Sequence, residues 1–155
     1  MRHSMQALRR LARDRNGNAM LEFALGSSVL IAAFTGTFQF GYTFLQYNNL
    51  ENAVARGARY ASLAPYDSLT TTPSTAFQTA VQNMVLYGSP APGTSPALAR
   101  LTPDNVRLTV TFTNGVPSAM TVSITDYTVD AVFMITTFTM KPQITYAYQG
   151  IWTPV

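Results

Sequence analysis

The chain has 155 residues, enough for one compact domain and an extra long helix but too few for two full domains. Its formal net charge is +3, and it has no cysteine, which excludes disulfides, thiolate catalysis and thiolate metal sites. The only histidine is His3, and no Gly-rich phosphate-binding motif occurs, so we expect no enzyme activity, metal site or cofactor.

A basic leader opens the chain. Residues 1–17 contain five arginines against the single acid Asp14, whereas the remaining residues are close to neutral. A nucleic-acid-binding protein would carry cations on its folded surface as well, so we do not expect nucleic acid as a partner. A basic segment before an apolar run is typical of a membrane-targeting segment and predicts an N-terminus on the cytoplasmic side.

The apolar run that follows is long enough to cross a membrane. No charged residue occurs from Phe23 to Leu50, and Phe23 to about Tyr42 supplies the roughly 20 helical residues that a bilayer core needs. A buried soluble helix seldom runs this far without a charge. A secretory signal peptide would end at a small-residue cleavage site, whereas here the helical pattern continues.

Beyond Phe44 the pattern becomes amphipathic and predicts that the same helix forms the spine of an outer domain. One helix is predicted from about Asn18 to Leu63, and Pro65 ends it. We therefore divide the chain into a leader (1–17), a transmembrane and spine helix (18–63) and an extracytoplasmic domain (64–155). Four glycines are candidate helix-packing positions: Gly26, Gly36, Gly41 and Gly57.

A carboxylate, Glu22, stands just inside the apolar run, where hydrocarbon disfavours it. Gly17 lies five residues earlier, in the string R-N-G-N-A-M-L-E-F. If the chain is cut after Gly17, Asn18 becomes the first residue and its α-amino group is a cation at the depth of Glu22.

This arrangement resembles the type IV prepilins, which have a short basic leader ending in Gly, a Glu at the fifth mature position and a long apolar helix. The resemblance implies that a prepilin peptidase cuts between Gly17 and Asn18. It also implies that Glu22, which Phe23 follows, is the carboxylate used in assembly. Asn18 departs from the family pattern, because many pilins begin with Phe or Met.

A more specific likeness covers residues 19–62. The strings A-M-L-E-F-A-L, Q-F-G-Y-T-F and Q-Y-N-N-L-E-N-A-V-A-R-G-A-R-Y-A-S resemble the TadE-like domain of tight-adherence pseudopilins. In the last string, the small residues Gly57 and Ala58 are typical of close helix packing. Arg56 and Arg59 are typical of a solvent-exposed helix face. The alternative is a subunit contact in a pilus-like assembly, formed by Arg56, Arg59 and Tyr60.

The outer domain is predicted to begin with a helix over residues 73–87, with Thr72 as its N-cap and Gly88 at its end. The string from Gly88 to Pro96 is rich in turn formers and predicts a surface loop. Residues 106–113 alternate between apolar and polar and predict a half-buried strand, followed by an Asn114-Gly115 turn.

Two further strands are predicted, one with Met120, Val122 and Ile124 and one with Ile144, Tyr146 and Tyr148. Residues 126–140 are ambiguous. We expect an α+β fold: a long N-terminal transmembrane and spine helix packed on a small antiparallel β-sheet with one extra short helix, as in pilins.

The leading hypothesis is a minor pilin or pseudopilin of a tight-adherence (type IVc pilus) assembly and secretion system that acts in pilus biogenesis and surface adhesion. It implies a single-pass protein of the bacterial inner membrane with a periplasmic domain, or a pilus component. Its implied partners are the prepilin peptidase, other Tad pilins or pseudopilins and the assembly platform. The alternative is a permanently anchored extracytoplasmic binding module that is neither processed nor assembled.

Overall fold

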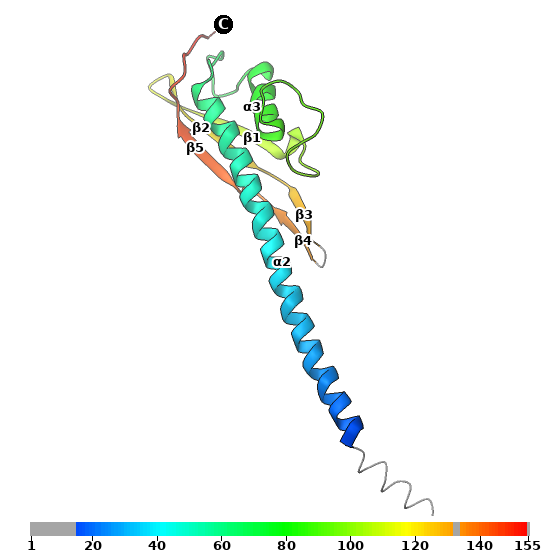
Figure 1. Ribbon diagram of the computed structural model, residues 1–155. Coiled ribbons are helices and arrows are strands. Elements are labelled where there is room, and N and C mark those ends of the chain that lie inside the picture. The colour runs from blue at the N-terminus through cyan, green and yellow to red at the C-terminus, as the bar shows by residue number, and fades with distance from the viewer. Residues whose placement is uncertain (1–14, 132–133, 155) are drawn as a thin grey trace, which may run out of the picture. The chain divides into compact units, whose positions relative to one another are not determined.

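The computed structural model describes residues 15–131 and 134–154 (Figure 1). Its contacts divide the chain into two units, one ending at Phe40 and one comprising Gly41–Val155. Helix α2 (Arg15–Leu63) contributes to both units, and the other helices and strands belong to the second. The fold is α+β with a long apolar N-terminal helix, one short α-helix and a small antiparallel sheet, which confirms the fold class predicted from the sequence.

In the first unit, α2 exposes apolar side chains around its whole circumference. Met20, Phe23 and Val29 are each more than 70% exposed. A helix that is apolar on every side finds no partner surface within its own unit, and such helices occur in large cores or in membranes. The exposed apolar side chains of this unit are Met20, Leu21, Phe23, Leu25, Val29, Leu30, Ile31, Phe34, Phe38 and Phe40.

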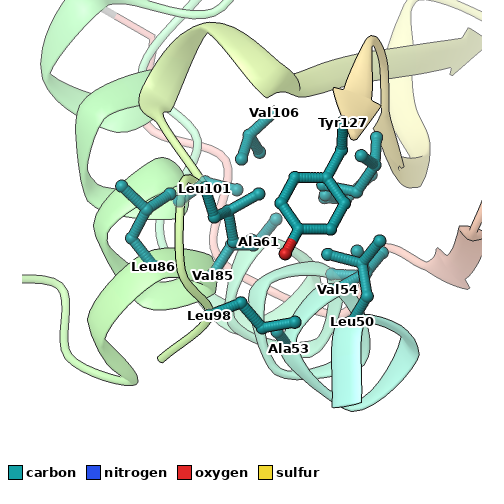
Figure 2. Packing of buried hydrophobic residues seen from close by; sticks show 14 of the residues in the cluster. Leu50, Ala53, Val54, Ala61, Val85, Leu86, Leu98, Leu101, Val106 and Tyr127 are labelled. Atoms are coloured by element: carbon teal, nitrogen blue, oxygen red, sulfur yellow. The ribbon is translucent and has the colours of Figure 1, made fainter. Parts of the chain in front are cut away.

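In the second unit, α2 buries one face in a hydrophobic core. Leu50, Val54 and Ala61 are fully buried at helical spacing, and Figure 2 shows Leu50 and Val54 converging with Tyr127 of a strand. Full burial of a side chain such as Leu50 stabilises the fold by roughly 1.5–3 kcal/mol relative to its exposure. The other elements contribute Phe77, Val81, Val85, Leu86, Val106, Val110, Met120, Val122 and Ile124.

Helix α3 (Thr75–Tyr87) packs against this face. Its N-cap is Ser74, so the predicted start at Pro73 with Thr72 as the cap is wrong. The Ser74 hydroxyl accepts a hydrogen bond from the Phe77 backbone N–H at 3.1 Å and donates one to the Asp67 carboxylate at 2.5 Å. This second bond fixes Ser74 as the capping side chain. At the other end, Gly88 takes the left-handed conformation predicted for a helix terminator.

The main sheet has three antiparallel strands in the order β1-β2-β5. They are β1 (Val106–Thr113), β2 (Val116–Ile124) and β5 (Gln143–Ala147), and a 3-10 turn, η1 (Pro103–Asn105), leads into β1. All three strands were predicted. Asn114 and Gly115 both have positive φ, which a two-residue hairpin turn requires. The register pairs Val110 with Met120, which places two core side chains side by side.

The ambiguous segment forms a second, two-stranded sheet. Strands β3 (Tyr127–Ala131) and β4 (Met134–Phe138) pair antiparallel with each other and with no other strand in the described residues. At the base of this hairpin, Phe138 packs on Tyr47 of α2 with ring centroids 5.4 Å apart. Figure 1 shows the hairpin extending from the main sheet toward the end of the unit where α2 enters it.

A C-terminal strap, residues 148–153, closes over the end of α2. The Tyr148 hydroxyl accepts a hydrogen bond from Tyr66 N–H at 2.9 Å and lies 3.1 Å from the Ala64 carbonyl oxygen. Gln149 N–H donates to the Ser62 carbonyl, and Gly150 lies so close that an added Cβ would be 2.6 Å from the Ala64 oxygen. The strap therefore satisfies carbonyls that the helix terminus leaves without partners.

Candidate functional site

The predicted cleavage and assembly residues lie in the first turns of α2. Gly17, Asn18, Glu22 and Phe23 are all exposed, and Phe23 is 77% exposed. Asn18 and Glu22 are four residues apart and so project from the same side of the helix. Among the side chains that the structure describes, none forms an ion pair with Glu22. The carboxylate is thus presented to the surroundings of the helix, amid apolar side chains.

The stretch around Glu22 belongs to the one helix in the described residues that is long and apolar enough to cross a membrane, judged by length and composition. Its most apolar window contains no buried residue. The helix is compatible with single-pass membrane anchoring.

The four candidate packing glycines fall into two groups. A Cβ added at Gly26, Gly36 or Gly41 would meet no atom within 4 Å, so these positions are open in a single copy of the chain. A Cβ added at Gly57 would collide with Val85 of α3. Gly57 therefore lets α2 and α3 approach closely inside the second unit.

Arg56, Arg59 and Tyr60 border a shallow, largely apolar hollow near the end of α2. It has a volume of about 440 Å³ and is completed by Leu63, Ala64 and Met84. Both arginines are exposed, and neither forms an ion pair within the described part of the chain. This surface combines two exposed guanidinium groups with an accessible apolar floor, and arginine is enriched at protein interfaces.

Comparison with known protein families identifies the segment that carries these residues. Residues 17–59 match the family model of TadE-like protein. This segment is TadE-like. The match indicates a Tad pilus-related protein, and the family is pilin-related and not an enzyme family. No curated protein and no solved structure matches the chain.

The TadE-like segment contains Gly17 through Arg59 and therefore Glu22 and all four glycines, but it ends one residue before Tyr60. Its boundary falls within α2, four residues before the helix ends at Leu63. The match thus covers the helix and none of the strands.

Sequence reasoning missed a polar hollow where the TadE-like segment meets the β3–β4 hairpin. Tyr42 and Gln46 of α2 line it together with Arg100, Tyr127 and Asp130, and its volume is about 220 Å³. Arg100 Nη1 lies 3.3 Å from Asp130 Oδ2, in an ion pair whose two side chains are both more than half exposed. No local motif predicts it, because thirty residues separate the two partners.

The Tyr127 phenol lies at the inner side of this hollow and donates a hydrogen bond to the Ala99 carbonyl at 3.0 Å. Burial raises the pKa of Tyr127, the neighbouring Tyr42 raises it further, and the Arg100 guanidinium opposes the shift. Tyr127 is therefore a neutral hydrogen-bond donor at physiological pH.

No group of three or more His, Cys, Asp or Glu side chains that could hold a metal ion occurs within the described ranges. The chemistry that the TadE-like segment offers is therefore that of an exposed carboxylate in an apolar helix and of two free arginines.

Proposed function

We propose that this chain is a minor pilin or pseudopilin of a tight-adherence (type IVc) pilus assembly and secretion system. It is inserted in the inner membrane with its N-terminus in the cytoplasm, cut after Gly17 by a prepilin peptidase, and contributes to pilus biogenesis and surface adhesion. The observation that carries the proposal is the TadE-like match over residues 17–59, which begins at the proposed cleavage site and contains Glu22.

The physical reason for cleavage lies in the cost of an unpaired carboxylate in hydrocarbon. An acid in a membrane helix costs about 2.5–3.5 kcal/mol at the bilayer centre and less near an end. Cleavage creates an α-amino group at Asn18, one helical turn from Glu22 and at similar depth. A carboxylate and an amine from neighbouring copies neutralise each other there, so pairing is favoured only after the leader is removed.

The exposed glycines and the arginine surface fit the same proposal. Gly26, Gly36 and Gly41 are open in the single chain, which leaves them available for close contact with a helix of another subunit. We assign the surface of Arg56, Arg59 and Tyr60 to a second subunit contact outside the membrane.

The first test is the mature N-terminus. Mass spectrometry of the protein purified from the membrane fraction is expected to find Asn18 as the first residue. A Gly17→Arg variant is the control, because it blocks the proposed cut and should retain the leader. If working wild-type protein retains the leader, the chain is instead the permanently anchored binding module.

The second test removes the charge of Glu22 while keeping its shape. A Glu22→Gln variant should be inserted and cut normally but should assemble few or no pili, as counted by electron microscopy. Glu51→Gln is the matched control, because Glu51 is also an exposed acid on α2 but lies after the apolar run. Normal piliation of Glu22→Gln would remove this carboxylate from the mechanism.

A further inference from the structure

One end of the second unit carries a collar of exposed apolar side chains. Phe44 and Leu45 of α2 are 56% and 54% exposed, and Ile135 of β4 is 66% exposed. Ile135 of β4 pairs across the hairpin with Asp130 of β3. Because Asp130 lines the same hollow as Tyr42 of α2, Ile135 lies at the end of the unit where α2 enters it. We call Phe44, Leu45 and Ile135 the collar.

A polar hollow lies at the same end of this unit. The Arg100–Asp130 ion pair and the hydroxyl-bearing Tyr42 and Tyr127 surround the hollow of about 220 Å³. These groups offer one guanidinium, one carboxylate and two phenols. A phospholipid headgroup with a phosphate and an ammonium group presents the complementary charges, and tyrosine is enriched at the headgroup level of membrane proteins.

The charges at this end favour lipid over a protein partner. From Gly41 to Leu50, α2 carries no charge, and the charged pair in the hollow is neutral as a whole. The other end of α2 in this unit, by contrast, exposes Arg56 and Arg59 without acidic partners among the described residues. Exposed apolar side chains and a net-neutral polar hollow at one end of the unit match the boundary between hydrocarbon and headgroups.

The position of Tyr42, Phe44 and Leu45 along α2 also supports contact with lipid. At 1.5 Å per residue, the twenty residues from Phe23 to Tyr42 span about 30 Å, the thickness of a bilayer core. Tyr42 then reaches the outer interface, and Phe44 and Leu45 follow directly. This step rests on the proposed function, because it requires the apolar part of α2 to span the membrane.

We propose that the β3–β4 hairpin docks on the outer lipid surface of the membrane that holds the helix, with Ile135 inserted at the hydrocarbon boundary and the Arg100–Asp130 pair among the headgroups. The outer domain thus has a second, non-covalent membrane contact in addition to its helix. That contact fixes the rotation of the domain about the helix axis relative to the bilayer.

The absence of cysteine makes a direct test practical. Three single-cysteine variants of the full chain, Ile135→Cys, Ile151→Cys and Phe34→Cys, are labelled with an environment-sensitive fluorophore. They are placed in nanodiscs of phosphatidylethanolamine and phosphatidylglycerol, with or without nitroxide-labelled lipid. Ile151 is the matched control, since it is 69% exposed against 66% for Ile135 but lies in the C-terminal strap.

The proposal predicts strong quenching at positions 34 and 135 and several-fold weaker quenching at 151. Quenching at 34, with equal and weak quenching at 135 and 151, overturns hairpin docking and leaves the membrane anchor intact. Lack of quenching at 34 overturns the anchor and, with it, hairpin docking.

Discussion

Helix α2 behaves differently in the two units through which it runs. Up to Phe40 it exposes large apolar side chains on every side, whereas from Leu50 onward it buries one face and exposes polar residues such as Arg56 on the other. Helical propensity does not distinguish these halves. What distinguishes them is where each finds an apolar environment: the first needs one from outside the chain, and the second builds its own with α3 and the sheet.

The largest expected effect comes from placing a charge in the first half. Ile31→Asp should weaken membrane insertion by about 3 kcal/mol, since an aspartate near the middle of a spanning helix has a cost of that size. Alkaline carbonate extraction of membranes measures the loss. Ile151→Asp changes an equally exposed isoleucine in the other unit and should remain membrane-bound. Equal extraction of both variants would contradict the contrast between the halves.

A glycine pair tests the second half. Gly57→Val should destabilise the second unit by roughly 1–3 kcal/mol, because the new side chain overlaps Val85 of α3. Gly36→Val adds the same atoms where none lies within 4 Å and should leave this unit's stability unchanged. Denaturant unfolding followed by near-ultraviolet circular dichroism reports the difference. A Gly57→Val protein as stable as the wild type would show that the helices do not meet there.

The strap that closes the second half provides a smaller effect. Tyr148→Phe should cost about 1–2 kcal/mol of unfolding free energy, because Tyr66 N–H and the Ala64 and Ile151 carbonyls lose a hydroxyl partner. Tyr146→Phe is the control, as that exposed side chain has no hydrogen bond among the described contacts. The same denaturant titration compares them, and indistinguishable midpoints would remove the hydroxyl from the stability of the strap.

The smallest effect is a pH dependence confined to the second half. Burial raises the pKa of Tyr66, Tyr127 and Tyr148 above the usual value of about 10. Above pH 10 the unfolded chain therefore holds fewer protons than the folded one, and the free energy of unfolding falls as pH rises. Below pH 10 the stabilisation is fully present. Tyr148→Phe should show a shallower fall, measured by repeating the unfolding titration at several pH values.

Local sequence signals predicted most of the secondary structure. The uncharged run from Phe23 to Leu50, the alternation in residues 106–113 and the Asn114-Gly115 turn each depend on neighbouring residues alone, and the structure contains the corresponding helix, strand and hairpin. The N-cap of α3 was predicted at Thr72 because proline follows it. Ser74 takes that role because Asp67, which lies outside the local motif, holds its hydroxyl.

Features that depend on distant residues could not be predicted. The β3–β4 hairpin was ambiguous because Tyr127 and Phe138 find their apolar partners on α2 and not in the segment itself. The Arg100–Asp130 pair and the contact of Gly57 with Val85 likewise require the tertiary fold. The roles of Gly17, Asn18 and Glu22 are predicted from their spacing and from the likeness to the family, and they stay predictions.

The C-terminal strap has a consequence for the order of events in biosynthesis. Tyr148 and Trp152 bond to Tyr66, Ala64 and Ser68 across more than eighty residues of sequence, so the end of α2 lacks these partners until residues 148–153 have been synthesised. The second unit therefore completes its folding only after these residues are available. Until then the carbonyls of Ser62 and Ala64 are accessible to water or to a chaperone.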